Sequence, residues 1–362
     1  MSSAGPIRFV LRFPSCPSIP SARSATSASL GFVPRLPLSS HNASRKGGTM
    51  KQAHTINFGS RKAKAIPYLL LAPGLLFYLV FSLGPSAATA AYSFTDASGL
   101  IGSKASWIGL DNYKEFLFMG ANVRDNLEIT ERTLLFCVLV TVIQTSFGLV
   151  AALLLDMRMR LSNLFRTVYF LPVILGATVI GLTWTLFLYP LGGPAERLLG
   201  LLGLHSEFLG GPPSTVFYWI VWIQIWANMG ITMIIFLGGL QTVPAELKEA
   251  ARIDGASGWK VFRHITFPLI TPSLNTNLLL EIIGSLQAWQ LFLVIKGPTN
   301  GLNVLGIWVY ALAFGRQSNN PTQAAMRQGY GAAASMVLFV LVLIIGLAAQ
   351  RLLARRERRI LG

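Results

Sequence analysis

Six long stretches of uncharged residues constrain what this chain can fold into. A helix needs about 20 residues to cross a hydrocarbon core of roughly 30 Å, and lipid offers no partner to free backbone N–H and C=O groups. Stretches of this length must therefore be helical. They fall within residues 65–95, 133–155, 167–190, 208–240, 272–295 and 328–350, and only the fifth contains a charge, at Glu281. We expect an all-α integral membrane protein with six transmembrane helices.

The composition agrees with a membrane protein, and the basic residues orient it. Only 12% of the residues are charged, against about 25% in a typical soluble domain. Sixteen Lys and Arg lie in the segments 51–64, 158–166, 248–263 and 351–359, against eight in the alternating set of loops. The positive-inside rule therefore places both termini in the cytoplasm. The net charge of +16 reflects this topology, so we expect no nucleic-acid partner.

A polar segment between the fourth and fifth stretches carries the most specific motif. Residues 249–268 read EAARIDGASGWKVFRHITFP. This segment resembles the EAA loop of permease subunits in binding-protein-dependent ABC importers, whose pattern is Glu-Ala-Ala, three free positions, Gly, nine free positions, Ile, one free position and Leu-Pro. The matching positions are Glu249, Ala250, Ala251, Gly255, Ile265 and Pro268, and Phe267 replaces the usual Leu.

The loop also reads as a short helix with defined ends. Thr242 can cap its start, Pro244 suits the first turn, and Gly255 suits a C-terminal stop. The resemblance implies that this helix docks on an ATPase, with Glu249 making a polar contact. Small Ala250 and Ala251 would allow a close fit in a groove.

The resemblance covers roughly residues 66–356. The segments 67–73, 93–96, 107–113, 165–172, 297–299 and 307–314 are similar to the first subunit of sugar-type permease pairs. It implies the type I ABC importer permease fold in a multi-pass protein of the bacterial plasma (inner) membrane. The implied partners are a homologous permease, two copies of an ATP-binding subunit, an extracytoplasmic solute-binding protein, a sugar substrate and membrane lipid.

This reading divides the chain into four parts. Residues 50–128 form a cytoplasmic lead, the first transmembrane helix and an external loop. Residues 129–350 form the core with helices two to six, including the coupling loop at 241–271, and residues 351–362 form a basic cytoplasmic tail. Residues 1–49 contain eleven Ser, six Lys or Arg and no acid. They resemble a transit peptide in composition, or translation starts at Met50, which we favour because the family resemblance begins after it. In either case we expect residues 1–49 to be disordered and unimportant for transport.

Candidate pathway residues are the polar groups inside the spans. Asn277, Glu281 and Ser285 repeat every four residues and share one helical face. Gln224 and Asn228 pair similarly, flanked by Trp222 and Trp226, and Gln144 lies in a third polar patch with Thr141 and Thr145. Amide and carboxyl groups beside aromatic rings suit hydroxyl-rich sugars. The alternative is that these groups only bond neighbouring helices or the partner subunit. We expect Gly176, Gly181 and Gly284 to be close-packing positions.

Neither enzyme chemistry nor a bound cofactor is predicted. Two cysteines, Cys16 and Cys137, and four scattered histidines provide no metal-ligand spacing, and no catalytic residues are expected. A Gly-x-x-x-x-Gly-Lys-Ser/Thr loop is absent from the sequence, so ATP hydrolysis is expected in a separate subunit. Two substrate alternatives stay open, a glycerol-phosphate ester and an acidic oligosaccharide. A self-contained secondary transporter is the alternative from another class.

Overall fold

The computed structural model describes residues 61–99, 104–119, 123–157, 161–299, 301–315 and 326–361. The chain divides into two compact units, Met1–Ala65 and Ile66–Gly362, and the second is described below. The expectations for residues 1–49 and for a start at Met50 lie outside the described residues.

Helices make up the regular structure of the described residues, with one isolated bridge between Thr95 and Trp107. The predicted all-α class is therefore confirmed for these residues. The longer helices are α1 (Arg61–Tyr78), α2 (Gly84–Tyr92), α4 (Val123–Asp156), α5 (Ser162–Ile174), α6 (Ala177–Phe187), α8 (Pro213–Gln241), α9 (Ala245–Ile253), α12 (Thr271–Leu286), α14 (Leu305–Phe314) and α16 (Gln328–Leu361). The shorter ones are α3 (Asp111–Leu117), α7 (Pro194–Gly200), α10 (Gly258–Val261), α11 (Phe267–Leu269) and α13 (Gln290–Ile295), with π-turns at Leu79–Leu83 and Phe262–Thr266 and a 3₁₀ turn at Phe208–Gly210.

Four helical spans of the described residues are long and apolar enough to cross a membrane: Pro67–Tyr92, Val123–Asp156, Pro213–Gln241 and Gln328–Ile360. A fifth arises if α5 and α6, which meet at a bend of 101°, count as one broken span. The remaining predicted span, 272–295, is divided between α12, with 16 residues, and the short helix α13. The helices thus lie where the uncharged stretches predicted them, but two stretches contain a break that the uncharged runs do not reveal.

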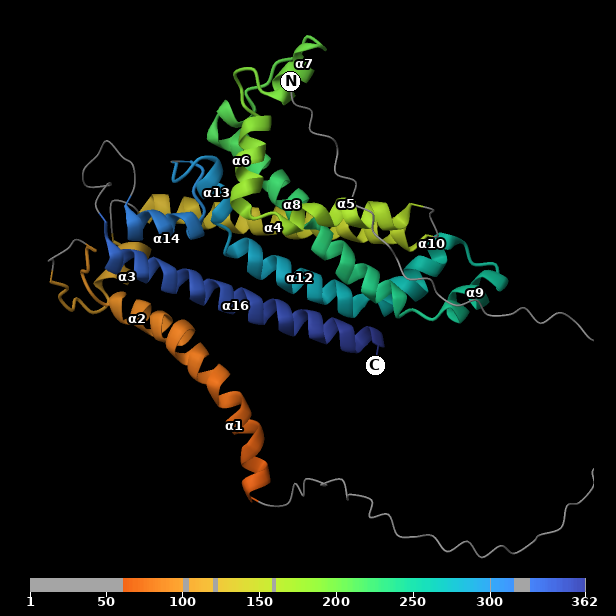
Figure 1. Cartoon of the computed structure of the whole chain (residues 1–362), viewed down its shortest axis with the longest axis horizontal. Helices are drawn as coiled ribbons and strands as arrows, with labels where there is room; N and C mark the ends of the chain where they lie inside the picture. The colour runs from red at the N-terminus through yellow and green to blue at the C-terminus, as the bar shows by residue number, and fades with distance from the viewer. Residues whose placement is uncertain are drawn as a thin grey trace, which may run out of the picture. The chain divides into compact units, whose positions relative to one another are not determined.

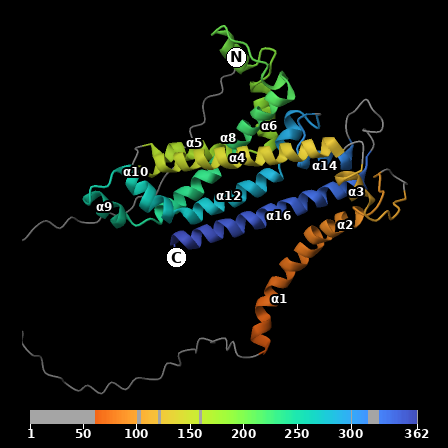
Figure 2. The same ribbon diagram turned by 180° about the vertical axis from the view of Figure 1, so that it is seen from behind.

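Helices α4, α5, α8, α12 and α16 run side by side in both views (Figures 1 and 2). Small residues allow the close approach of their backbones. A Cβ at Gly148 of α4 would lie 2.5 Å from the Thr232 side chain of α8, and one at Gly230 of α8 would lie 2.5 Å from the backbone oxygen of Tyr169 in α5. Glycine is therefore required where α8 crosses both neighbours.

A polar cluster, buried at Asn126 and Tyr330 and half-buried at Glu115 and Arg327, joins four helices at the end of the bundle where α3 lies. Asn126 Nδ2 donates to the hydroxyl of Tyr330 (3.1 Å), while Trp308 Nε1 donates to Asn126 Oδ1 (3.0 Å). Arg327 forms a bidentate ion pair with Glu115 (2.7 and 2.6 Å) and stacks over the Tyr330 ring. Hydrogen bonding to Glu115 raises the pKa of Arg327 above its ordinary value, so this guanidinium stays charged. The cluster fixes α3 against α4, α14 and α16.

Candidate functional site

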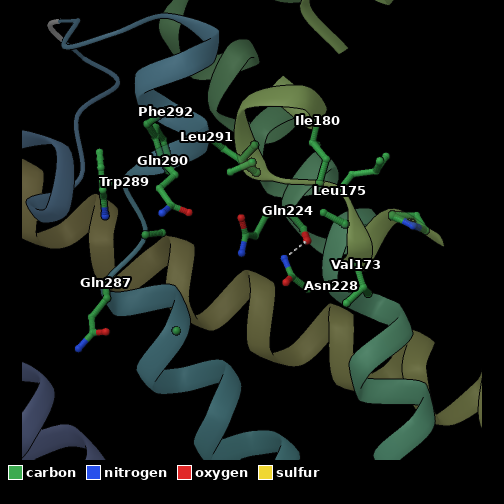
Figure 3. A pocket seen from close by; sticks show the side chains of 15 residues that line it. Val173, Leu175, Ile180, Gln224, Asn228, Gln287, Trp289, Gln290, Leu291 and Phe292 are labelled. Atoms are coloured by element: carbon green, nitrogen blue, oxygen red, sulfur yellow. Dashed lines mark hydrogen bonds between the residues drawn. The ribbon is translucent and has the colours of Figure 1, made fainter. Parts of the chain in front are cut away.

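Two helix breaks meet around a cavity of about 380 Å³ (Figure 3). The first break lies between α5 and α6, where Leu175 and Gly176 adopt extended backbone with ψ of 134° and 152°. The second lies between α12 and α13, at residues 287–289. Irregular backbone at membrane depth is tolerated where it is buried in protein or lines a water-filled cavity. The two helix breaks therefore make this cavity the candidate translocation site.

Four amide side chains line this cavity: Gln224, Asn228, Gln287 and Gln290. Asn228 Nδ2 donates to the backbone oxygen of Gln224 (3.0 Å), which orients its amide. In Figure 3 the amide of Gln290 points toward Gln224 and Asn228, whereas Gln287 extends away from them. Since an amide both donates and accepts hydrogen bonds, the facing amides form a polar patch suited to hydroxyl groups.

An aromatic surface borders the same cavity. Trp289 is 37% exposed, and its ring stacks on Tyr310 with a centroid distance of 5.7 Å and an interplanar angle of 16°. The sequence had suggested Trp222 and Trp226 as the aromatic neighbours of Gln224. That expectation was wrong for the cavity lining, because Trp222 packs edge-on against Phe147 and Trp226 against Trp184.

A second, smaller cavity of about 120 Å³ shares Gln224, Asn228 and Gly284 with the first. Six side chains proposed from the sequence as pathway residues line it: Gln144, Gln224, Asn228, Asn277, Glu281 and Ser285. They come from α4, α8 and α12. The tertiary structure thus brings together three polar patches that are separate in the sequence.

Glu281 forms the centre of a hydrogen-bond network between these three helices. It is 8% exposed, and its carboxyl accepts hydrogen bonds from Thr145 (2.7 Å), Thr232 (2.8 Å) and Gln144 (3.4 Å). Asn277 Nδ2 donates to the backbone oxygen of Thr232 (3.3 Å). Glu281 therefore bonds neighbouring helices and also lines the smaller cavity.

Other expectations are corrected by the packing. Gly181 is a close-packing position, because a Cβ there would lie 2.6 Å from Val294. Gly176 and Gly284 are not, since a Cβ at either would meet no heavy atom within 4 Å. Gly176 instead lies in the first helix break, and Gly284 opens onto both cavities.

The coupling loop lies at the opposite end of the bundle from α3 (Figures 1 and 2). Its helix α9 ends at Ile253, and Gly255, with φ of +80°, provides the predicted C-terminal stop two residues later. The Ala256 N–H bonds to the Ala251 oxygen (2.9 Å) and the Gly255 N–H to the Arg252 oxygen (3.1 Å), the paired bonds of a Schellman motif. The start was predicted wrongly. Pro244 occupies the N-cap, and the Thr242 hydroxyl bonds back to Gly239 in α8.

The motif residues of the loop divide into an exposed and a packed group. Glu249 and Ala250 are exposed on α9, and Ala251 is half-buried. Ile265 packs against the apolar cluster between α4, α8 and α12, while Pro268 lies half-buried in α11. One part of the motif is free to meet another subunit, and the other part fastens the loop to the bundle.

Residues 144–359 match the family described as "Binding-protein-dependent transport system inner membrane component". This chain belongs to that family. Its members are inner-membrane proteins, which agrees with the apolar helices described above.

Relatives and a solved structure support this assignment over most of the chain. The arabinooligosaccharides transport system permease protein AraP of Bacillus subtilis is 31% identical over 298 residues, covering 80% of this chain and 88% of AraP. The trehalose/maltose transport system permease protein MalF of Thermococcus litoralis is 30% identical over 283 residues, covering 78% and 91%. A chain from a bacterial ABC transporter involved in import of the acidic polysaccharide alginate superposes with a TM-score of 0.69 at 22% identity, covering 83% and 98%. This last likeness shows that the fold is that of an ABC importer chain.

Sequence reasoning missed Gln287 and Gln290. Both lie in an apolar stretch that reads as a continuous span, without a proline at the break. A signal was nevertheless present, because two glutamines flank Ala288 and Trp289 at membrane depth, where polar side chains face protein or water.

Proposed function

We propose that this chain is the permease subunit of an ATP-driven importer. With a homologous partner permease it forms the pathway for a sugar or oligosaccharide delivered by an external binding protein. Family membership and the names of the relatives support this function. The observation that carries it is the pair of cavities sharing Gln224, Asn228 and Gly284, which place facing amides beside an aromatic ring.

The chemistry of the larger cavity suits a saccharide. Sugar hydroxyls donate and accept hydrogen bonds, as do the amides of Gln224, Asn228 and Gln290. The apolar C–H face of a sugar ring can lie on Trp289, which Tyr310 holds in a stacked position. A volume of about 380 Å³ falls within the usual range for small-molecule sites, roughly 300–1,000 Å³. In this proposal Asn277, Glu281, Ser285 and Gln144 line the pathway next to that site.

Coupling to ATP hydrolysis proceeds in this proposal through α9. Its exposed surface carries Glu249 and Ala250 together with two exposed apolar residues, Leu247 and Ile253, of which Ile253 is 87% exposed. Such apolar exposure on a polar helix suits docking in a groove of an ATPase subunit, of which two copies serve the pair. Lys248 Nζ lies 3.6 Å from Asp156 at the end of α4, and Ile265 packs on the bundle. Movement of the docked helix would therefore be passed to α4 and α8 as a rigid-body shift.

The proposed topology has six spans, with both termini and α9 in the cytoplasm. The third span consists of α5 and α6, and the fifth of α12 and α13. The four-part division predicted from the sequence is retained, with the coupling loop at 241–271. None of the most apolar part of the span 67–92 is buried against the rest of this chain. This span therefore faces lipid or the partner permease.

One variant tests the site without disturbing the packing. Gly284→Leu places a side chain into both cavities, where a Cβ meets no atom within 4 Å. We expect ATP-dependent sugar uptake into proteoliposomes to fall by at least about tenfold, a change of roughly 1.4 kcal/mol, while the complex still assembles. The matched control is Gly238→Leu, since Gly238 on α8 also faces open space but lines neither cavity.

Three outcomes would contradict the proposal. Normal uptake by Gly284→Leu would remove the cavities from the pathway. Purification of the tagged chain without a second permease and an ATP-binding subunit would remove the importer assembly. Uptake driven by an ion gradient without ATP would favour the self-contained secondary transporter.

A further inference from the structure

We infer that the two cavities select uncharged saccharides and discriminate against sugars that carry a carboxylate or phosphate. This inference rests on the proposed function and narrows its substrate class. The chemical nature of the lining distinguishes neutral from anionic substrates, the alternatives that the sequence left open.

Most of the polar side chains in the lining are amides. They are Gln144, Gln224, Asn228, Asn277, Gln287 and Gln290. Among the described residues that line either cavity, no Lys, Arg or His occurs, and the single ionisable side chain is the acid Glu281. An anion taken out of water needs a paired charge or several strong donors. An anionic sugar would here lose its hydration without gaining a cation, next to a carboxyl group.

Helix ends do not replace the missing cation. Four of them border the larger cavity: the C-terminal ends of α5 and α12 and the N-terminal ends of α6 and α13. C-terminal ends carry partial negative charge and N-terminal ends partial positive charge. Two of each kind therefore offset one another, and the cavity has little net field to attract an anion.

The strongest donors beside the smaller cavity are already used within the protein. The hydroxyls of Thr145 and Thr232 donate to Glu281, and the Gln144 amide nitrogen donates to Glu281 and to Thr232 (3.0 Å). Gln144 Oε1 is buried without a hydrogen-bond partner among the described residues. Gln144 therefore has no unpaired donor to offer an anion.

The likeness to the alginate importer does not decide the substrate. That chain is described as acting in import of an acidic polysaccharide, but at 22% identity the likeness shows the fold alone. Specificity depends on the lining side chains, and those described here are of the opposite kind from a site built for carboxylates, where Arg or Lys would be expected.

Direct binding to the permease complex tests this inference. The complex of this chain with its partner permease and ATPase is placed in nanodiscs without a binding protein. It is titrated with di- to tetrasaccharides of glucose, galactose and arabinose, and with uronates matched to their carboxyl-reduced forms. Binding is followed by tryptophan fluorescence, and Trp289→Phe establishes that the signal comes from the cavity. We expect each neutral sugar that binds to do so at least about tenfold more tightly than its uronate.

A charge placed in the cavity gives the second arm. In Gln290→Lys, the ammonium group enters the space between Gln290 and Gln224, and we expect the uronate-to-neutral affinity ratio to rise about tenfold. Gln287→Lys is the graded comparison, because Gln287 lines the same cavity but extends away from those amides (Figure 3), and we expect it to raise the ratio less than Gln290→Lys does.

The outcomes separate this inference from the proposed function. A uronate that binds the unmodified complex as tightly as its neutral partner overturns the selection and leaves sugar transport in place. An unchanged ratio in Gln290→Lys overturns the assignment of selectivity to this cavity. Absence of binding by every sugar, together with absence of uptake, overturns the proposed function and the inference with it.

Discussion

The coupling loop and the cavity pair are specified in different ways. The motif of the loop is contiguous, from Glu249 to Pro268, and its helix ends through bonds between near neighbours in the chain. The polar lining of the cavities is spread from Gln144 to Gln290 and converges only through packing of α4, α8, α12 and α13. A short local motif is thus enough to specify a surface that meets another subunit, whereas the lining of a pathway is assembled only when the whole bundle packs.

The candidate pathway residues also differ from one another. Glu281 and Asn277 hold helices together by bonds within the chain, while Gln224 and Asn228 also reach the larger cavity. Variants of the loop should therefore change coupling without changing stability. Variants of the network should change stability, and variants of the larger cavity should change substrate affinity.

The largest effect is expected from Gly255→Pro. Proline fixes φ near −65° and has no N–H, but Gly255 has φ of +80° and donates to the Arg252 oxygen. Loss of the Schellman turn, about 3 kcal/mol, should lower coupled sugar uptake about a hundredfold while the bundle keeps its melting temperature. The control is Gly258→Ala in the same loop, where a Cβ meets no atom within 4 Å. Coupled uptake at the normal rate in Gly255→Pro would break the assignment of α9 to coupling.

A change between α8 and α5 should destabilise the bundle. Gly230→Val would place a Cβ 2.5 Å from the Tyr169 oxygen, and such overpacking costs about 3 kcal/mol. Thermal unfolding of the purified complex should occur at a clearly lower temperature. Gly238→Ala on the same helix meets open space and should leave stability equal or raise it by up to about 1 kcal/mol. Equal melting temperatures for the two variants would contradict the described packing of α8.

A smaller loss is expected from Thr145→Val, which removes a donor to the buried Glu281 carboxyl. Leaving a buried acceptor without one of its donors costs about 1–3 kcal/mol. Thr141→Val is the matched control one turn away, because the Thr141 hydroxyl is buried without a partner among the described residues. Its replacement should be neutral or stabilising. Denaturation of both variants in mild detergent measures the difference, and an equal loss in both would show that the network does not depend on Thr145.

The smallest effect distinguishes the two glutamines at the second helix break. Gln290→Ala should raise the KM for sugar uptake about fivefold, from loss of a hydrogen bond worth roughly 1 kcal/mol. Gln287→Ala should raise the KM by a smaller factor, since Gln287 lines the same cavity but its side chain extends away from the facing amides (Figure 3). Uptake kinetics in proteoliposomes test this pair, and an equal rise in both would move the ligand to another part of the cavity.

Much of this protein follows from the sequence alone. Long uncharged stretches predicted the helices because lipid leaves backbone groups no other partner, and the turn at Gly255 follows from a conformation that glycine readily adopts. Both are properties of residues close together in the chain. The polar pathway candidates were also found from the sequence, because polar side chains within uncharged spans stand out.

The tertiary structure decided what those helices do. The span Pro67–Tyr92 and helix α8 have similar mean hydropathy, 1.7 and 1.9, but 0% of the first apolar window is buried and 56% of the second. The tertiary structure also interrupts the helices of two apolar stretches, at Gly176 and at residues 287–289. The cavity lies between these two interruptions. Burial and cavities depend on contacts between distant segments, such as Gly148 with Thr232 and Gly230 with Tyr169. The hydropathy of a local stretch of sequence does not predict such contacts.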